Sequence, residues 1–336
     1  MTNETHNDAN PENPELLKRL VTIFMPHQTR RMLSHYKGRD HARFVHYTSA
    51  EAALKIIKSK RLWMRNTNCM ADSREVQHGF DILNRFFSDR SRGKEFTTSL
   101  DACAPGAALE AVNLFVEAWR DIRFNTYLSA ISEHDDDEDA HGRLSMWRAF
   151  GGSLAAARVG LVLTVALPKE ESSPLNLFFS PVAYLSEQDA HKMLFEVIAN
   201  VDAERDYLST LDHKIIVNAI FGMLLTGVVC LKHVGFREER EWRVIYAPER
   251  SRSPLMEYST EVISGVPQVV HKIPLDATVS PSIAHLDLAC LFDRLIIGPS
   301  PYPWPMHEAF VSALKEAGIA DADKRVWNSG IPIRHA

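Results

Sequence analysis

The residues best suited to chemistry lie in two short segments, residues 46–49 (His-Tyr-Thr-Ser) and residues 237–243 (Arg-Glu-Glu-Arg-Glu-Trp-Arg). In the second segment Glu239 and Glu241 are two residues apart, and the apolar run 244–246 follows. Residues two apart on a strand share a face, so we predict a strand that presents both carboxylates together. Such a pair can transfer protons or stabilise a developing positive charge. The alternative is a solvated, salt-bridged strand face.

The first segment ends a short strand-like run and begins a helix. Polar side chains at a strand end commonly line the crevice in which α/β proteins bind ligands. Thr48 and Glu51 stand three residues apart, as in a capping box that would open a helix over residues 49–59. The alternative is that Thr48 or Ser49 only caps this helix, while His46 satisfies a hydrogen bond in the core.

Two further groups of acidic residues are weaker candidates for a functional site. Asp72, Glu75 and His78 lie at a loop-to-helix junction, where Asp72 suits an N-cap. Residues 133–139 are almost all acidic, but they lack the spacing and the glycine of a calcium loop. We therefore predict a mobile, solvated loop that is too polar to be buried. The chain contains no P-loop, GxGxxG, GxSxG or HExxH motif, so those enzyme classes have no support.

Composition bounds the class of protein. The 336 residues are 45% hydrophobic and 24% charged, which is typical of a globular protein. A net charge of −5 provides no general attraction for nucleic acid or an anionic membrane. No apolar run approaches the ~20 residues that span a bilayer, and the polar, acidic start lacks the features of a secretory signal. With four scattered cysteines and no CxxC pair, we expect a cytoplasmic protein with reduced thiols.

The hydrophobic pattern predicts an α/β fold of the mixed α+β kind, with a central mixed sheet flanked by helices. Residues 1–15 are expected to form a disordered tail, 16–40 an N-terminal helical extension, and 41–336 a single domain. The predicted strands cover residues 44–47, 61–65, 125–132, 159–167, 241–246, 291–297 and 325–327. The predicted helices cover residues 15–36, 49–59, 74–87, 107–119, 144–150, 306–317 and parts of 186–228. Residues 94–105 are expected to be a loose connection.

Taken in order, these segments resemble a bacterial family catalogued as domain of unknown function 2971. The resemblance runs over roughly residues 43–334 and rests on the following segments: 44–57, 62–65, 71–75, 128–133, 144–147, 239–243, 295–299 and 329–334. A further resemblance is to the ADP-ribosyltransferase superfamily, which places His or Arg on a first strand, Tyr or Ser on a second element and Glu on a late strand. Here His46 matches the first position and Glu239-Arg240-Glu241 the last.

This second resemblance implies an ADP-ribosyltransferase-like fold and the transfer of ADP-ribose from NAD to a protein or nucleic-acid acceptor, as in a bacterial toxin or a phage defence system. Glu241 would stabilise the oxocarbenium-like ribose and bond one of its hydroxyls. Glu239 would orient or deprotonate the acceptor. The resemblance needs no metal.

The remaining contacts to NAD are also implied by the resemblance. The residues concerned are His46, Tyr47, Thr48, Ser132, Trp147, Arg148 and Arg243. His46 and Thr48 would hold the adenosine ribose, Tyr47 or Trp147 would stack on a ring, and Arg243 or Arg148 would pair with the pyrophosphate. The middle position of the pattern stays open among Ser129, Ser132 and Tyr127.

Two alternatives belong to other classes. A metal-dependent nuclease or phosphoesterase would bind magnesium through Asp72, Glu75, Glu239 and Glu241. A non-catalytic partner-binding protein would have Glu241 neutralised by arginine, or lying far from His46. If His46 and Glu241 converge on one pocket, nucleotide chemistry is favoured.

Overall fold

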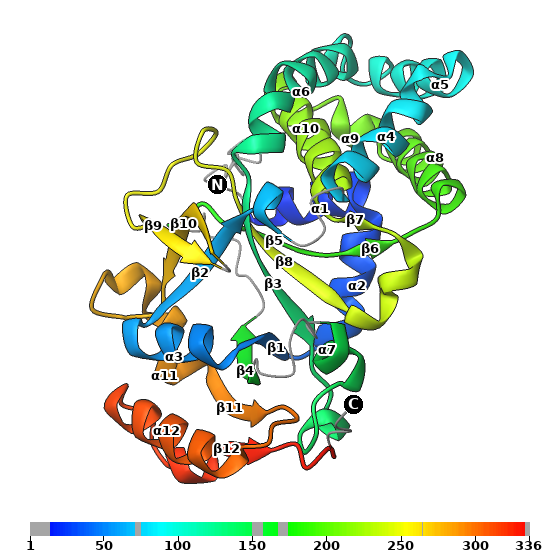
Figure 1. The fold of residues 1–336 in the computed structure, drawn as a ribbon. Helices are drawn as coiled ribbons and strands as arrows, with labels where there is room; N and C mark the ends of the chain where they lie inside the picture. Colours follow the sequence, from blue (N-terminus) through cyan, green and yellow to red (C-terminus); the bar gives the residue numbers. More distant parts are fainter. Residues whose placement is uncertain (1–13, 71–74, 150–156, 167–173, 264, 333–336) are drawn as a thin grey trace, which may run out of the picture.

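In the computed structural model, residues 14–70, 75–149, 157–166, 174–263 and 265–332 are described. They form a mixed α/β fold in which helices flank a large mixed sheet (Figure 1). The predicted N-terminal helix is two helices, α1 (Pro14–Phe24) and α2 (Pro26–Tyr36). They meet at Pro26, because its ring suits the first turn of a helix but has no N–H to continue one. The predicted tail lies outside the described residues, apart from the start of α1.

Ten of the described strands form one sheet, in the order β12-β11-β4-β1-β3-β2-β10-β9, with β8 paired to β3 and β5 paired to β8. Its strands are β1 (His41–Ser49), β2 (Arg61–Asn66), β3 (Tyr127–Glu133), β4 (Arg158–Ala166), β5 (Phe178–Pro181), β8 (Glu241–Tyr246), β9 (Glu257–Ile263), β10 (Val266–Pro274), β11 (Phe292–Ile297) and β12 (Val326–Asn328). The pairs are antiparallel except β11 with β12. A separate parallel pair joins β6 (Ala183–Tyr184) to β7 (Leu231–Lys232).

Strand β3 connects the two halves of the sheet. Its first residues, Tyr127 and Leu128, pair with β2, whereas Ser132 and Glu133 at its end pair with β1. β8 pairs along the other edge of β3 from Tyr127 to Ser132. β1 and β2 therefore diverge on either side of the middle of β3.

The helices form two groups, at opposite ends of the molecule in Figure 1. The first group is α4 (Glu75–Ser88), α5 (Arg90–Asp101), α6 (Ala107–Phe124), α8 (Glu187–Ala203), α9 (Arg205–Leu208) and α10 (His213–Val229), which share a core with α1, β3 and β8. The second group is α3 (Ala50–Ser59), α11 (Leu288–Leu291) and α12 (Pro303–Glu316), which pack on β2, β4, β10 and β11. The short α7 (Leu144–Ala149) belongs to neither group and packs on β1, β4 and β11. The 3₁₀ turns are η1 (Thr67–Cys69), η2 (Asp136–Glu138), η3 (Val234–Glu239), η4 (Pro281–Leu286) and η5 (Ala322–Lys324).

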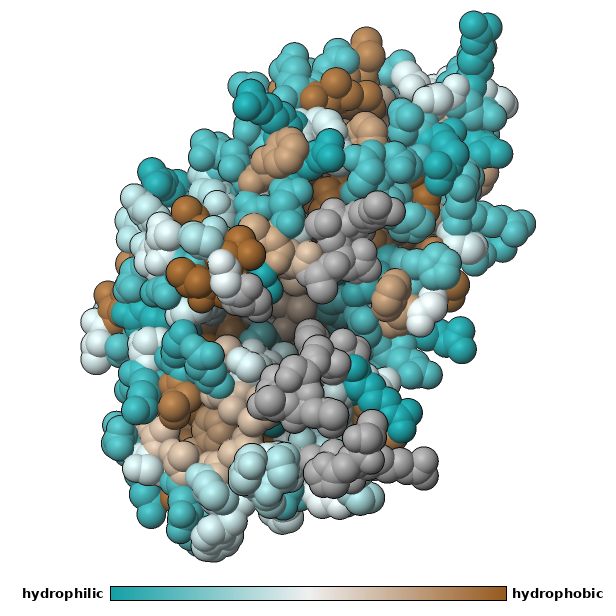
Figure 2. Space-filling view, viewed as in Figure 1, coloured by the Kyte–Doolittle hydropathy of each residue, from teal (hydrophilic) through white to brown (hydrophobic). Residues whose placement is uncertain are grey.

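Figure 2 shows that the first group of helices presents mostly hydrophilic side chains on this side, with apolar residues in small, separate groups. Within the part of the chain that the structure describes, no helix has both the length and the apolar character that crossing a membrane requires.

Two local predictions were wrong, and one hairpin was not predicted. Residues 94–105 lie largely in α5, because Phe96 and Leu100 are four residues apart and both buried. The cap of α3 is Ser49, whose Oγ accepts a hydrogen bond from Ala52 N at 3.1 Å, while Thr48 still belongs to β1. The β9–β10 hairpin was not predicted, because β9 is exposed along most of its length and carries no clear apolar alternation.

The two sides of the β1–β3–β8 region differ in chemistry. One side, here the aromatic face, carries Phe44, Ile131 and Trp242, which pack in one buried cluster. The other, here the glutamate face, carries the cross-strand neighbours Ser132 and Glu241. Because side chains alternate along a strand, every second residue belongs to the same face.

The indole of Trp147 packs closely against the backbone of three glycines, Gly142, Gly160 and Gly298. A Cβ at Gly298 would lie 2.8 Å from the indole, and one at Gly142 would lie 2.6 Å from it. A Cβ at Gly160 would lie 2.8 Å from Val45 and 3.5 Å from the indole. The approaches under 3 Å are closer than side chains tolerate, so the indole can pack at Gly298 and Gly142 only because these residues have no side chain.

We therefore predict that Gly298→Ala lowers the free energy of unfolding by about 1–3 kcal/mol, because the added methyl overpacks the indole. Gly222→Ala is the matched control: no atom lies within 4 Å of a Cβ there, and alanine favours the helix by up to about 1 kcal/mol. Both are measured by urea unfolding. A Gly298→Ala protein at least as stable as the parent would contradict this packing.

Candidate functional site

Glu241 is buried and fully compensated by cations. Its side chain lies on the glutamate face with Arg243, whose Nε is 2.8 Å from Glu241 Oε1. Lys232 Nζ lies 3.3 Å from Glu241 Oε2. Burial alone would raise the pKa of Glu241. The nearby charges of Arg243 and Lys232 lower it by more than burial raises it, so the pKa falls below its ordinary value. The carboxylate is ionised, and with 6% of the residue exposed it does not face an open cleft.

Glu239 was predicted to share a strand with Glu241, and this is wrong. Glu239 ends the turn η3, and Arg240 then adopts a left-handed conformation (φ 46°) before β8 begins at Glu241. The two carboxylates still converge, because Lys232 Nζ also lies 2.7 Å from Glu239 Oε2. One buried ammonium therefore bridges the pair, and the pairing comes from Lys232 rather than from strand alternation.

His46 lies where β1 and β2 diverge. Its Nδ1 is 2.8 Å from Ala130 O in β3. The half-buried ring therefore forms a hydrogen bond with a strand carbonyl that a backbone N–H of a neighbouring strand would otherwise bond. Burial lowers the pKa of the imidazole, and the bond to Ala130 opposes this only in part. With Nδ1–H donating to the carbonyl, the ring is neutral and is held by the sheet.

The predicted NAD contacts divide between the two faces of the sheet. Tyr47, Ser132, Trp147, Glu241 and Arg243 lie on or against the glutamate face. The alternation along β1 directs His46 and Thr48 to the aromatic face instead. His46 and Glu241 therefore project in opposite directions and do not meet across one pocket.

Internal contacts account for the aromatic pair. The Tyr47 and Trp147 rings meet edge-to-face with centroids 4.8 Å apart, and Trp147 Nε1 donates to His141 O at 2.8 Å. The Tyr47 hydroxyl accepts from Arg143 N at 2.8 Å. Arg143 in turn donates to Glu239 O at 3.1 Å. Arg143 thus links the two segments predicted to carry the chemistry, while the predicted Arg148 is exposed.

The acidic stretch 133–139 is not a solvated loop, contrary to the prediction. Glu133 is 2% exposed and pairs with Arg31 and Arg240. Arg43 pairs with Asp136 and Asp139 within the same stretch. The stretch is ordered because arginines from other elements compensate its charge, which its own composition does not reveal.

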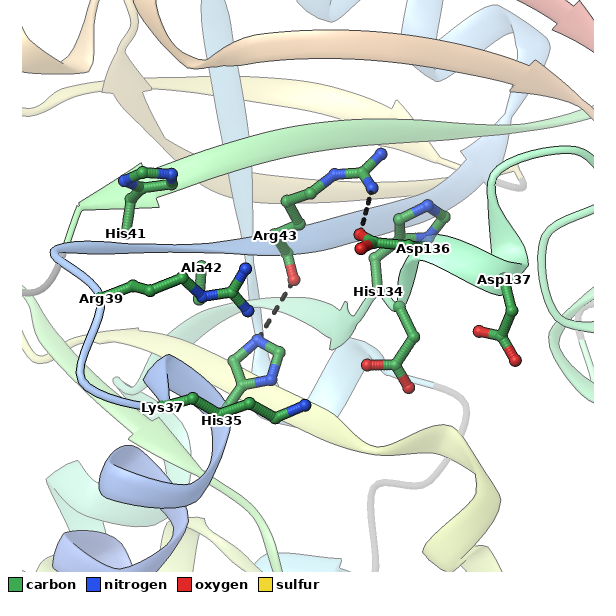
Figure 3. A pocket seen from close by; sticks show the side chains of 10 residues that line it. His35, Lys37, Arg39, His41, Ala42, Arg43, His134, Asp136 and Asp137 are labelled. Carbon is green, nitrogen blue, oxygen red and sulfur yellow. Dashed lines mark hydrogen bonds and ion pairs between the residues drawn. The ribbon is translucent and has the colours of Figure 1, made fainter.

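A pocket of about 440 Å³, here the charged pocket, opens beside the acidic stretch (Figure 3). It is lined by His35, Lys37, Arg39, His41, Ala42, Arg43, His134, Asp135, Asp136 and Asp137. Its volume lies within the ~300–1,000 Å³ of typical small-molecule sites.

The charges of the charged pocket are unequally satisfied. Asp135 pairs with Arg240, and Asp136 pairs with Arg43. Lys37 and Arg39 reach in from the opposite wall, and neither forms an ion pair within the described part of the chain (Figure 3).

Two residues that line the charged pocket each hold a buried polar atom without a hydrogen-bond partner. His134 Nε2 bonds Asp139 Oδ1 at 2.9 Å, but its buried Nδ1 lies 3.8 Å from Glu138 Oε2 and has no hydrogen-bond partner. Arg43 Nε is likewise buried without a partner. Unpartnered buried polar groups are costly, but these two atoms have almost no accessible surface, so a ligand in the pocket would reach them only after a local rearrangement.

The charged pocket was missed at the level of sequence, although a signal exists there. Every second residue from 35 to 43 is basic: His35, Lys37, Arg39, His41 and Arg43. This spacing places a series of basic residue types just before and within β1. The prediction of a site was based instead on Glu239 and Glu241 in the segment 237–243.

The magnesium alternative lacks a described site. Asp72 lies outside the described residues, and Glu75 begins α4 with its side chain outside them. Within the described ranges, no group of three or more His, Cys, Asp or Glu side chains is arranged to hold a metal ion. Comparison with protein-family models, with curated proteins and with solved structures finds no match to this chain.

We predict that Glu241→Gln lowers the free energy of unfolding by about 3–5 kcal/mol, because it leaves Lys232 and Arg243 with an uncompensated buried charge. Glu239→Gln, at a side chain that is 20% exposed, serves as the matched control with a smaller loss. Guanidinium unfolding measures both. A Glu241→Gln protein as stable as the parent would show that this carboxylate is not a structural ion-pair partner.

Stability should also fall on mild acidification. The pKa of His46 and that of His134 are lowered in the folded protein, chiefly by burial. The unfolded chain therefore takes up protons first as pH falls below about 6.5, and the stability present at pH 7.5 declines. The loss from each histidine is about 1.4 kcal/mol for every unit by which folding lowers its pKa. His46→Asn, which keeps a donor to Ala130 without titrating there, should flatten the urea-unfolding profile; an unchanged slope would contradict the assignment.

Proposed function

We propose that this chain is a binding protein whose charged pocket takes a phosphorylated sugar or nucleotide. The observation that carries the proposal is the pair of cations, Lys37 and Arg39, which reach into a pocket of about 440 Å³ without ion-pair partners among the described residues. Phosphate oxygens are the natural partners for such groups. The excess of uncommitted positive charge favours an anionic ligand.

The rest of the pocket wall suits the sugar. Asp136, with a side chain 88% exposed, and Asp137 offer carboxylate oxygens that accept from hydroxyl groups. A ligand with phosphate at one end and hydroxyls at the other therefore matches both walls, and NAD and ADP-ribose are the first probes to use.

The second candidate is NAD-dependent ADP-ribosyl transfer on an ADP-ribosyltransferase-like fold. It is favoured by the glutamate face, where Tyr47, Trp147, Glu241 and Arg243 gather and Arg143 joins Tyr47 to Glu239. Against it stands the compensation of Glu241, because both of its oxygens are engaged by Lys232 and Arg243. A carboxylate held in this way cannot contact a ribose without a rearrangement.

Two exposed arginines distinguish the candidates. For the binding protein, Arg39→Glu should weaken ADP-ribose binding by about tenfold or more, since a charge-assisted contact is worth about 1.5 kcal/mol or more. The matched Arg148→Glu variant should bind as the parent does. Calorimetric titration measures both, and the affinity should fall as salt is added.

The opposite result would favour transfer. If Arg148→Glu abolishes binding and Arg39→Glu does not, the pyrophosphate lies against α7 and the charged pocket is not the site. Nicotinamide release from NAD, followed with the same protein variants, completes the comparison. Release by the parent protein that is lost in Glu239→Gln would overturn the assignment as a binding protein.

A further inference from the structure

The edge of the sheet at β9 differs from its other edges. Among the described strands, the sheet ends at β12, β5 and β9. An edge strand presents backbone N–H and C=O groups without strand partners, and proteins usually protect it by shortness, by proline or by a covering element. β12 has three residues, and β5 ends at Pro181 and packs against α2. β9 has seven residues, Glu257–Ile263, and contains no proline.

The side chains of β9 leave the strand accessible. Four of its seven residues are exposed and the other three are half-buried. β10 pairs with β9 along its whole length, so one backbone edge of β9 is satisfied and the other faces away from the sheet (Figure 1). That outer edge offers donors and acceptors at alternate residues, which a further strand can pair in full. The backbone of β9 therefore calls for an extended chain as its partner.

The two glutamates of β9 are engaged by cations of the same hairpin region. Charged side chains on an edge strand ordinarily discourage further pairing. Glu257 Oε1 lies 2.8 Å from Arg61 Nη2 in β2, and Glu261 Oε1 lies 2.9 Å from Lys272 Nζ in β10. The carboxylates are four residues apart and share one face of the strand. Their cations weaken, without removing, the repulsion that another strand would meet.

The opposite face of the hairpin carries exposed apolar side chains. Tyr258 and Val262 lie on it, with 63% and 64% of each residue exposed. Across the hairpin Thr260 pairs with Val269, which is 41% exposed. An aromatic residue opposite a β-branched residue on the adjacent strand stabilises a sheet. A partner strand that placed such residues beside Tyr258 and Val262 would therefore be favoured.

The sequence of β9 is complementary to itself in one antiparallel register. A twofold axis perpendicular to the sheet keeps the apolar faces of two copies on the same side, and centred on Thr260 it pairs all seven residues. The pairs are Glu257 with Ile263, Tyr258 with Val262, Ser259 with Glu261, and Thr260 with its own copy.

The neighbouring registers place like charges together. Centred on Ser259, the pairing would put Glu257 opposite Glu261, and centred on Glu261 it would put that residue opposite its own copy. Like charges directly opposite each other destabilise a sheet. Registers centred further out pair less than half of the strand. The full-length register is therefore also the one that the charges favour.

We propose that β9 pairs with β9 of a second copy of this chain, antiparallel and centred on Thr260, so that the two sheets continue into one. The free backbone edge supplies the hydrogen bonds. The pair of Tyr258 with Val262, which the symmetry repeats, supplies the apolar contact. Because each copy contributes a single strand of seven residues, the dimer is a weak one, of roughly micromolar affinity.

Analytical ultracentrifugation of the full chain over roughly 1–500 µM tests the pairing. The parent protein should pass from monomer to dimer within this range. Val262→Lys should weaken the dimer by about tenfold or more, because it removes both copies of the pair with Tyr258. Val116→Lys is the matched control: Val116 is 61% exposed on α6, and its replacement should leave dimerisation unchanged.

Position 260 tests the register, because each copy of Thr260 lies opposite the other. Thr260→Lys and Thr260→Glu should each weaken self-association severalfold, since like charges then face each other. An equimolar mixture of the two variants should form a heterodimer at least as tight as the parent dimer. Thr260 is exposed, so both variants should remain folded, which urea unfolding verifies.

Three outcomes would overturn the proposal. A parent protein that stays monomeric over the whole range does not pair through β9. A dimer that is weakened neither by Val262→Lys nor by Thr260→Lys is formed by another surface. If the Thr260→Lys and Thr260→Glu proteins associate no better together than apart, Thr260 does not lie on the twofold axis and the register is wrong.

Discussion

The burial of carboxylates at the junction of β3 and β8 constrains the rest of the structure. Glu133 ends β3 and Glu241 begins β8, and each is almost fully buried. An ionised carboxylate can stay in such a place only if cations reach it from elsewhere. Arg31 brings α2 onto Glu133, and Lys232 brings β7 onto Glu241. The N-terminal helices and the second short sheet are therefore attached to the main sheet by charge as well as by apolar packing.

Much of the secondary structure could be predicted because it follows from local patterns. Residues 241–246 were predicted as a strand and form β8, since charged residues give way to an apolar run there, although the expected extension of this strand to Glu239 was wrong. The acidic stretch and α5 were not predicted, because their order depends on distant partners. Arg43 lies more than 90 residues from Asp136 in sequence, and α5 packs against α8, which lies far along the chain. Local composition contains no information about such compensation.

The same limit explains the outcome at the predicted site. The sequence could show that Glu239 and Glu241 are close and that arginines accompany them. It could not show that Arg240 adopts a left-handed conformation, which ends strand alternation between the two glutamates. Nor could it show that Lys232 bridges them. A charged cluster in a sequence therefore does not distinguish a catalytic carboxylate from one that only forms structural ion pairs. The two are distinguished by whether cations within the fold already neutralise the carboxylate.

The balance of charges separates the two kinds of site in this protein. Around Glu241 every charge is matched within the fold, so a ligand would have to displace Lys232 or Arg243 at the cost of a buried ion pair. In the charged pocket Lys37 and Arg39 meet solvent, and a ligand anion would displace only water. Unsatisfied groups next to open volume, rather than the most strongly charged cluster, therefore mark where a ligand can be recognised at least cost.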